Sequence, residues 1–297
     1  MDIENLMSRC TLCPRECGAD RNSGSGFCGE GRTVRIARAA PHMWEEPCIS
    51  GERGSGTVFF SGCTLKCVFC QNHEISQEGK GFGVTEERLA EIFTELRDSG
   101  VHNLNMVTPT HFIPQIVTAL ELCGDLGIPT VFNMSGYEKP ETLEMLRGKA
   151  DIFLPDLKYF DSGASAKYSG AEDYFERAMG AVEKMVEMVG EPVFGEDGLM
   201  KRGVIVRHMI LPNHRHDSIA LMEKLAERFS SEAIMVSLMC QYTPVYRARE
   251  FREIDRRLSA FEYRTVAEAF GKTGFGGYLQ HRESADEGFI PEFYTEP

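Results

Sequence analysis

The sequence predicts an α/β fold built on a parallel sheet. The chain has 297 residues, of which 42% are hydrophobic, so it can bury one large core. Six short apolar runs alternate with amphipathic helical segments, and that alternation is typical of parallel strands joined by right-handed crossovers. A flat doubly wound sheet fits this pattern as well as an open barrel does. The expected strands cover residues 57–61, 104–108, 130–134, 152–156, 204–210 and 234–239.

A helical segment is expected after each of these strands. Thr85 suits the N-cap of the first helix, acidic residues follow it in the first turn, and Gly100 suits its exit. Residues 161–174 and 190–203 have the length and composition of loops. Residues 271–277 suggest a glycine-rich hinge before an acidic tail that covers the open side of the sheet. The expected helices cover residues 86–99, 114–123, 140–147, 174–189, 218–229 and 250–270.

The composition of the chain indicates which partners are excluded and in which cellular compartment the protein is expected. The formal net charge of −13 argues against a nucleic-acid partner, because phosphate binding needs a basic surface. No run reaches the roughly 18 apolar residues of a membrane span, and residues 1–9 lack the apolar core of a signal peptide. We therefore expect a cytoplasmic protein. In that reducing compartment ten cysteines, seven of them in two tight clusters, indicate metal ligands rather than disulfides.

The strongest chemical signal is a C-x3-C-x2-C motif formed by Cys63, Cys67 and Cys70, directly after the first apolar strand. Three thiolates on one short loop can hold three corners of a four-iron cube and leave the fourth iron open for a ligand. A structural zinc site instead closes with four protein ligands. The alternative is therefore a zinc knuckle that borrows a fourth ligand such as His73.

A second cysteine cluster lies near the start of the chain, in a C-x2-C-x3-C-x10-C arrangement rich in glycine. Four ligands in a short, turn-rich segment predict a closed structural metal site. The sequence does not decide between zinc and a second iron-sulfur cluster, and free or redox-active thiols are the alternative. The four residues are Cys10, Cys13, Cys17 and Cys28.

Polar side chains follow five successive strands, and the carboxyl ends of parallel strands are where ligand sites form. Asp156 ends an otherwise apolar strand, which is costly unless a charged group pairs with it. Lys158 is the obvious partner, because residues two apart on an extended segment share one face. The candidate site residues at the strand ends are Thr108, Thr110, His111, Asn133, Ser135, Asp156, Lys158 and Arg207.

The three-cysteine loop, with Phe69 before its last cysteine, resembles the loop of radical S-adenosylmethionine (SAM) enzymes. Together with the strand-end motifs it looks like the pyruvate formate-lyase activating enzyme branch, in the subgroup with an N-terminal Cys-x-x-Cys-Pro-Arg-x-Cys-Gly motif. The resemblance implies an open six-stranded (β/α)6 partial barrel with a small N-terminal metal knuckle. It implies three parts: the knuckle over 1–32, the core over 33–247, and a C-terminal helix and tail over 248–297.

In that family the methionyl amine and carboxylate of SAM chelate the open iron, an electron cleaves the sulfonium, and a 5'-deoxyadenosyl radical abstracts hydrogen. The resemblance implies that Cys63, Cys67 and Cys70 hold this [4Fe-4S] cluster and that Phe69 lies against the adenine. It also implies an electron donor of the flavodoxin or ferredoxin type. The protein substrate would be a glycyl radical enzyme, which this chain activates, or another protein; direct modification of a side chain or of a small molecule is the alternative.

The resemblance also assigns the charged strand ends. Asp156 and Lys158 match the Asp-x-Lys motif, in which the aspartate helps to bind a monovalent cation beside SAM and the lysine lies in the SAM pocket, and Arg207 faces the cofactor. The chain departs from the family where the usual Gly-Gly-Glu-Pro is replaced by Thr-Pro-Thr-His at 108–111. The hydrogen bond to the methionyl amine is therefore expected from Thr108, Thr110, His111 or backbone carbonyls, with Asn133 and Ser135 nearby.

Overall fold

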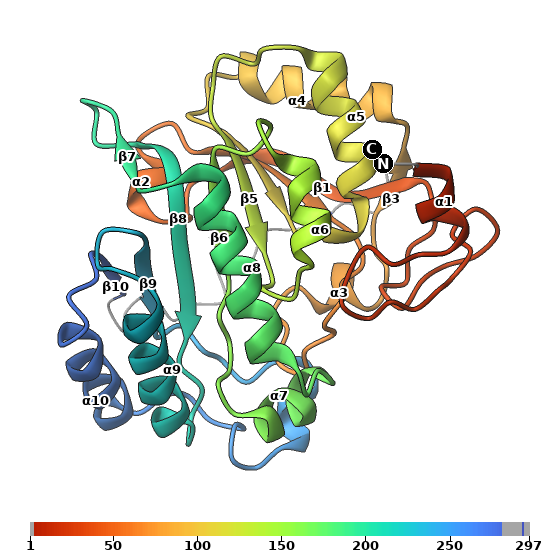
Figure 1. Cartoon of the computed structure of the whole chain (residues 1–297). Coiled ribbons are helices and arrows are strands. Elements are labelled where there is room, and N and C mark those ends of the chain that lie inside the picture. Colours follow the sequence, from red (N-terminus) through yellow and green to blue (C-terminus); the bar gives the residue numbers. More distant parts are fainter. Residues whose placement is uncertain (1–2, 281–292, 294–297) are drawn as a thin grey trace.

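A computed structural model describes residues 3–280 and Phe293. Its centre is one ten-stranded sheet in the order β10-β9-β8-β6-β5-β4-β2-β1-β3, with β7 paired to β8 (Figure 1). The strands are β1 (Val34–His42), β2 (Ser55–Phe60), β3 (Phe82–Val84), β4 (Leu104–Val107), β5 (Thr130–Met134), β6 (Ile152–Pro155), β7 (Val193–Phe194), β8 (Met200–Met209), β9 (Met235–Met239) and β10 (Gly277–Leu279).

Helices connect most of the parallel strands. The α-helices are α1 (Ile3–Ser8), α2 (Pro47–Ser50), α3 (His73–Ser76), α4 (Glu86–Asp98), α5 (Ile113–Cys123), α6 (Pro140–Leu143), α7 (Ser162–Ser169), α8 (Tyr174–Val189), α9 (Arg215–Arg228) and α10 (Ala260–Gly271). Three 3-10 turns are η1 (Thr110–Phe112), η2 (Glu144–Leu146) and η3 (Tyr246–Glu250). No helix in the described part of the chain combines the length and apolarity needed to cross a bilayer.

The prediction of an α/β fold on a mostly parallel sheet is confirmed. The six expected strands appear as β2, β4, β5, β6, β8 and β9, and each is parallel to its neighbour in the sheet. The sheet extends further than expected, because β10 adds a parallel strand beside β9 while β1 and β3 add two antiparallel strands beyond β2. In the described residues the edge strands β3 and β10 do not pair with each other, so the sheet stays open.

Four expected elements differ from the structure. The expected loop over 190–203 contains β7 and the first residues of β8, which pair with each other. The helix expected over 250–270 begins only at Ala260, because Ser259 caps it and forms a capping box with Glu262. The expected loop over 161–174 contains α7, which Asp161 caps by accepting a hydrogen bond from the Ala164 N–H. The expected glycine-rich hinge ends inside β10, and most of the acidic tail lies outside the described residues.

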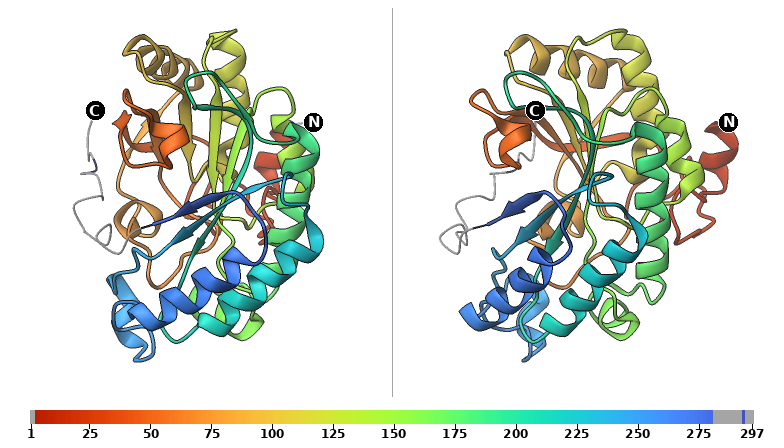
Figure 2. Two further views of the ribbon diagram at one scale, coloured as in Figure 1. Left: turned by 90° about the vertical axis from the view of Figure 1, so that its left-hand side faces the viewer. Right: turned by 60° about the vertical axis from the view of Figure 1, so that its left-hand side comes forward.

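The two faces of the sheet have different coverings. The long helices α4, α5, α8, α9 and α10 lie around the outer face (Figure 2). On the inner face, Cys48 and Ile49 of α2 pack against Val131 of β5, Leu154 of β6 and Ile205 of β8.

Two residues further along these three strands, toward their carboxyl ends, the inward positions hold Asn133, Asp156 and Arg207. Residues two apart on a strand share a face. Side chains alternate between the two faces of a strand. The face that carries the apolar residues packed against α2 therefore also carries these polar side chains, nearer the carboxyl ends of the strands.

Residues 3–32 are mainly turns after α1, and they are anchored to the rest of the chain. The buried Arg21 donates to the carbonyl of His111, at 2.6 Å from Nη1, and Gln115 of α5 donates to the carbonyl of Arg32 at 2.7 Å. The Cys63 N–H donates to the carbonyl of Cys28. The N-terminal segment is thus packed directly on the three-cysteine loop. The division of the chain at residues 32 and 247 stays a prediction.

Candidate active site

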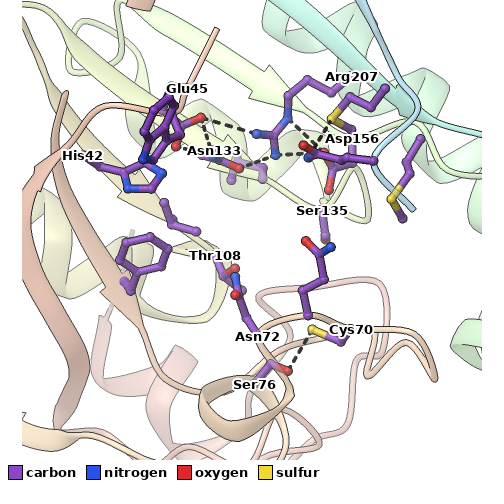
Figure 3. A pocket seen from close by; sticks show the side chains of 18 of the residues that line it. His42, Glu45, Cys70, Asn72, Ser76, Thr108, Asn133, Ser135, Asp156 and Arg207 are labelled. Carbon is purple, nitrogen blue, oxygen red and sulfur yellow. Dashed lines mark hydrogen bonds and ion pairs between the residues drawn. The ribbon is translucent and has the colours of Figure 1, made fainter. Parts of the chain in front are cut away.

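One cavity of about 640 Å³ opens at the carboxyl ends of the strands and reaches along the inner face of the sheet. Figure 3 shows part of its lining, where Asn133 of β5, Asp156 after β6 and Arg207 of β8 lie across the cavity from Cys70. The structure brings most of the predicted site residues to this lining, namely Cys63, Cys67, Phe69, Cys70, Thr108, Asn133, Ser135, Asp156, Lys158 and Arg207.

The cysteine loop turns sharply out of the buried strand β2. Gly62 has φ of 80°, and a Cβ there would lie 2.9 Å from the carbonyl oxygen of Cys28. Only glycine adopts this conformation without strain and leaves room for that contact. The turn carries the three following cysteines from the end of β2 to the rim of the cavity.

Each cysteine sulfur in this loop has a hydrogen-bonding neighbour. The Leu65 N–H lies 3.4 Å from Cys63 Sγ, and the Ser76 hydroxyl lies 3.3 Å from Cys70 Sγ. The hydroxyl of Ser169, at the end of α7, lies 2.9 Å from Cys67 Sγ. Such contacts tune iron-sulfur clusters, because they stabilise charge on the ligand sulfur.

The donor set fits a cluster better than a single ion. Burial raises the pKa of Cys70 to about 12 and also raises that of Cys67, although Lys158 opposes the latter shift. Bound iron would keep such thiols deprotonated. Cys63, Cys67 and Cys70 supply three thiols, whereas a structural zinc ion takes four protein ligands. A four-iron cube binds each thiolate on a different iron, so three separated thiols on one wall meet its requirement.

A chain of charges crosses the cavity wall opposite the cysteines. Asp156 accepts from Lys158 Nζ at 2.5 Å and from Arg207 Nε at 3.0 Å. Burial alone would raise the pKa of Asp156, but Arg207 and Lys158 hold that pKa below its ordinary value. Arg207 also donates to Asn133 Oδ1 at 2.5 Å. Asp156 is therefore an ionised carboxylate with a cation on each side.

The sequence analysis gave no role to Glu45, which extends the same chain of charges. This residue lies between β1 and α2, its side chain is 8% exposed, and its carboxylate is 3.5 Å from Arg207 Nη1. Asn105 and Asn133 also donate to it, at 3.1 and 3.3 Å from Oε1. No spacing in the sequence marks Glu45, because its partners come from three strands that only the folded sheet brings together.

Thr110 and His111 are not among the residues that line the cavity, and their contact with SAM stays a prediction. His111 is 2% exposed, and its Nε2 lies 2.6 Å from the carbonyl oxygen of Ser61. Burial, and to a lesser degree Arg21, lowers the pKa of His111 to about 3, so the ring is neutral. Of the residues expected to replace the Gly-Gly-Glu motif, Thr108 is the one whose side chain lines the cavity.

Thr110 points instead to Glu138, a second residue that the sequence analysis missed. The hydroxyls of Thr110 and Ser135 both donate to Glu138 Oε1 at 3.0 Å. Its other oxygen, Oε2, is buried and has no hydrogen-bond partner among the described residues. Burial raises the pKa of Glu138 to about 7. Glu138 thus links the residues that follow β4 to those that follow β5.

We expect Glu138→Gln to stabilise the protein at alkaline pH. A carboxyl whose pKa is raised from 4.5 to about 7 on folding binds its proton more tightly in the folded state, so stability is lost as pH rises through that window. The loss amounts to about 3 kcal/mol at 1.36 kcal/mol per pKa unit. Glutamine keeps the acceptor oxygen but does not ionise.

Urea denaturation at pH 5 and pH 8 measures this effect. The variant should match the wild type at pH 5 and exceed its free energy of unfolding at pH 8. Glu141→Gln, at an exposed position three residues away, is the matched control and should change little at either pH. A stability difference that is the same at both pH values would contradict the shifted pKa of Glu138.

The N-terminal cysteines are close together but do not form a closed metal site in the structure. Cys10, Cys13 and Cys28 are buried, whereas Cys17 is exposed. The sulfurs of Cys17 and Cys28 lie 3.4 and 3.5 Å from the point where Gly26 would carry a Cβ. Burial raises the pKa of Cys13 to about 12, and the three other thiols add to that shift. A metal held by these four residues stays a prediction.

Comparisons with known proteins agree with the site. The family described as the Radical SAM superfamily matches residues 57–225. An uncharacterized protein of Methanocaldococcus jannaschii is 29% identical over 276 residues, which cover 89% of this chain and 75% of that protein. The pyruvate formate-lyase-activating enzyme of Clostridium pasteurianum is 27% identical over 174 residues, covering 57% of this chain and 66% of the enzyme.

Two solved structures also resemble the chain. Methylornithine synthase aligns with a TM-score of 0.49 and 16% identity, over 72% of this chain and 60% of that one. SuiB of Streptococcus suis, bound to S-adenosylmethionine, aligns with a TM-score of 0.49 and 18% identity, over 75% of this chain and 49% of that one.

Proposed function

Since this chain belongs to the radical SAM superfamily and is a radical SAM enzyme, we propose that Cys63, Cys67 and Cys70 hold its [4Fe-4S] cluster. At this cluster SAM would be cleaved reductively. One observation carries the assignment: the three thiols line the same cavity as Asp156, Lys158 and Arg207. The open, mostly parallel sheet with its long helices outside supports a partial (β/α)6 barrel as the scaffold.

When bound, the cluster and SAM supply a 5'-deoxyadenosyl radical that abstracts hydrogen from the substrate. Phe69 is 4% exposed and is held edge to face against Tyr242, at 5.9 Å between ring centroids, so it offers a rigid apolar surface for the adenine. Thr108 and Ser135 line the cavity, and because the Ser135 hydroxyl already donates to Glu138, we propose that the Thr108 hydroxyl serves the amino acid part of SAM.

Asp156 and Lys158 serve the charged end of SAM in this proposal. Both oxygens of Asp156 already accept from cationic side chains. The geometry therefore favours Lys158 and Arg207, rather than a monovalent cation, as the charges that neutralise Asp156. A carboxylate and an ammonium held 2.5 Å apart can form ion pairs with the ammonium and the carboxylate of a bound amino acid.

For the substrate, we propose a glycine of a partner enzyme, in which this chain would install a glycyl radical. The similarity to the pyruvate formate-lyase-activating enzyme and the Asp-x-Lys motif at 156–158 support this activase role. A flavodoxin- or ferredoxin-like protein would donate the electron. The second candidate, direct modification of another protein side chain or a small molecule, is favoured by the Thr-Pro-Thr-His segment at 108–111, which departs from the activases.

Anaerobic reconstitution with iron and sulfide, followed by dithionite and SAM, tests the core of this proposal. We expect an iron-sulfur absorption spectrum and release of methionine and 5'-deoxyadenosine. A colourless protein that binds zinc would refute it.

The substrate is tested with a partner enzyme whose glycine carries deuterium. Deuterium in 5'-deoxyadenosine supports the activase role. If no deuterium is transferred and another substrate is converted, direct modification is supported.

We also propose that Cys10, Cys13, Cys17 and Cys28 hold a structural zinc or a second iron-sulfur cluster. Loss of one ligand of a closed site weakens folding. We expect Cys13→Ser to bind this metal at least about tenfold more weakly and to melt at a lower temperature, with SAM cleavage retained once the protein is folded. Metal analysis and thermal melts decide this.

Cys123→Ser, at a half-buried cysteine outside both clusters, is the matched control. Metal content that is unchanged in Cys13→Ser would remove the proposed site. A stable Cys13→Ser protein without SAM cleavage would instead make the N-terminal metal an electron-transfer cluster.

A further inference from the structure

We propose that Ser169 tunes the reduction potential of the cluster on Cys63, Cys67 and Cys70, and that Arg15 of the N-terminal segment is the positioning residue for Ser169. This inference rests on the proposed function of that loop. It adds two residues from distant parts of the chain, neither of which lines the cavity.

The first step is the contact between Ser169 and Cys67. Ser169 Oγ lies 2.9 Å from Cys67 Sγ, the shortest of the three contacts to cysteine sulfurs in the loop. Ser169 is 3% exposed, so water does not compete for its hydroxyl. Ser76, which contacts Cys70, lines the cavity and meets whatever binds there, whereas Ser169 lies behind the loop.

The second step fixes the direction of the hydrogen bonds. Tyr159 Oη lies 2.8 Å from Ser169 Oγ, and Tyr159 is 1% exposed. A thiolate that ligates iron has no proton to donate, so the Ser169 hydroxyl must donate to Cys67 Sγ. The oxygen of Ser169 is then free to accept from the Tyr159 hydroxyl. Two buried hydroxyls thus form a chain of donors that ends on the sulfur.

The third step is the clamp that holds Ser169. Arg15 Nη2 donates to the Ser169 carbonyl at 2.9 Å, and Nη1 donates to the carbonyl of Gly170. On the other side, Arg15 Nε donates to the carbonyl of Thr64 at 2.9 Å. One planar guanidinium therefore ties the end of α7 to the residue next to Cys63.

The surroundings of Arg15 keep this clamp in place. Its guanidinium carbon lies 4.5 Å from the ring centroid of Phe27 and 5.0 Å from that of Tyr137. Gly170 ends α7 in the left-handed conformation, with φ of 59°, so that two successive carbonyls face Arg15. A lysine at position 15 has no planar fork and cannot replace all three hydrogen bonds.

The physical consequence concerns the one-electron reduction that precedes SAM cleavage. A low-potential donor gives one electron to the cluster, which gains one negative charge. A hydrogen bond donated to a ligand sulfur stabilises the more negative state, so it raises the reduction potential. Removal of the Ser169 hydroxyl should therefore lower the midpoint potential and make the cluster harder to reduce.

Potentiometric titration of the anaerobically reconstituted full-length protein, followed by electron paramagnetic resonance, tests the proposal. We expect a lower midpoint potential in Ser169→Ala, with iron content and the spectral type of the reduced cluster unchanged. Tyr159→Phe and Arg15→Ala should shift the potential in the same direction by less, and Arg15→Lys should restore part of the Arg15→Ala shift. Ser165→Ala is the matched control, because Ser165 is 1% exposed on the same helix and its hydroxyl contacts the Ser162 carbonyl.

The outcomes separate this inference from the proposed function. A wild-type protein without a reducible cluster would refute the assignment of Cys63, Cys67 and Cys70. A normal wild-type cluster with the same potential in Ser169→Ala would overturn the role of Ser169, and a Ser165→Ala shift as large as that of Ser169→Ala would overturn it too. If Ser169→Ala fails to fold, Tyr159→Phe decides: an unshifted potential in that variant overturns the proposal.

Discussion

Replacement of Cys63, Cys67 and Cys70 by alanine is expected to abolish SAM cleavage, with 5'-deoxyadenosine falling to the level of a reaction without enzyme. The three side chains supply every thiol on the cavity wall, so the variant has no protein ligand left for the cluster. Iron content and the visible spectrum should fall together with the product. Chromatography of 5'-deoxyadenosine after anaerobic reduction measures the effect.

A matched control shows whether the loss is local. Changing Cys48, Cys123 and Cys240 to serine also removes three cysteines, but these residues lie outside both clusters. We expect this control to keep the cluster and to cleave SAM. A cysteine-loop variant that still formed 5'-deoxyadenosine would show that the cluster lies elsewhere in the protein.

The second large effect is expected from Asp156→Ala. This change leaves Lys158 and Arg207 without the carboxylate that both of them contact, in a wall where their side chains are 18% and 14% exposed. Removal of one partner from such a buried group typically costs about 3 to 5 kcal/mol. We expect a loss of that order in the free energy of unfolding, together with severely weakened SAM binding.

Chemical denaturation and anaerobic equilibrium binding measure the two quantities separately. Asp156→Asn keeps the shape of the side chain and should lose less stability than Asp156→Ala. The double variant Asp156→Ala with Lys158→Ala should be less destabilised than the sum of its parts, because one unpaired cation has gone. Unchanged stability and SAM affinity in Asp156→Ala would leave this residue as an ordinary polar group at a strand end.

The elements of the fold that have a clear local apolar pattern could be predicted from the sequence. The six central strands are mostly apolar runs, and the sequence predicts each of them. Strand β10 was missed because it has only three residues, begins at Gly277 and is held in place by its pairing with β9. The start of α10 was misplaced, because the capping box at Ser259 and Glu262 outweighs the helical pattern of the residues before it.

Local sequence patterns also limit which site residues could be predicted. The cysteine loop and the pair of Asp156 and Lys158 are local in sequence, so their spacing alone indicated them. Glu45 was missed because Asn105, Asn133 and Arg207 reach it from three different strands. The contact between Ser169 and Cys67 joins residues 102 positions apart, and no pattern along the chain marks it.

The clamp formed by Arg15 has a consequence for the order in which the chain folds. Arg15 is synthesised before its partners, which lie 49 and 154 residues further along the chain. Contacts between such distant residues form late, because the intervening chain must first be synthesised and then closed into a loop. The cysteine loop is therefore synthesised about 100 residues before Ser169 and Gly170, which Arg15 needs in order to hold the loop in place. The contacts of Arg15 with Ser169 and Gly170 therefore form only after synthesis has passed residue 170.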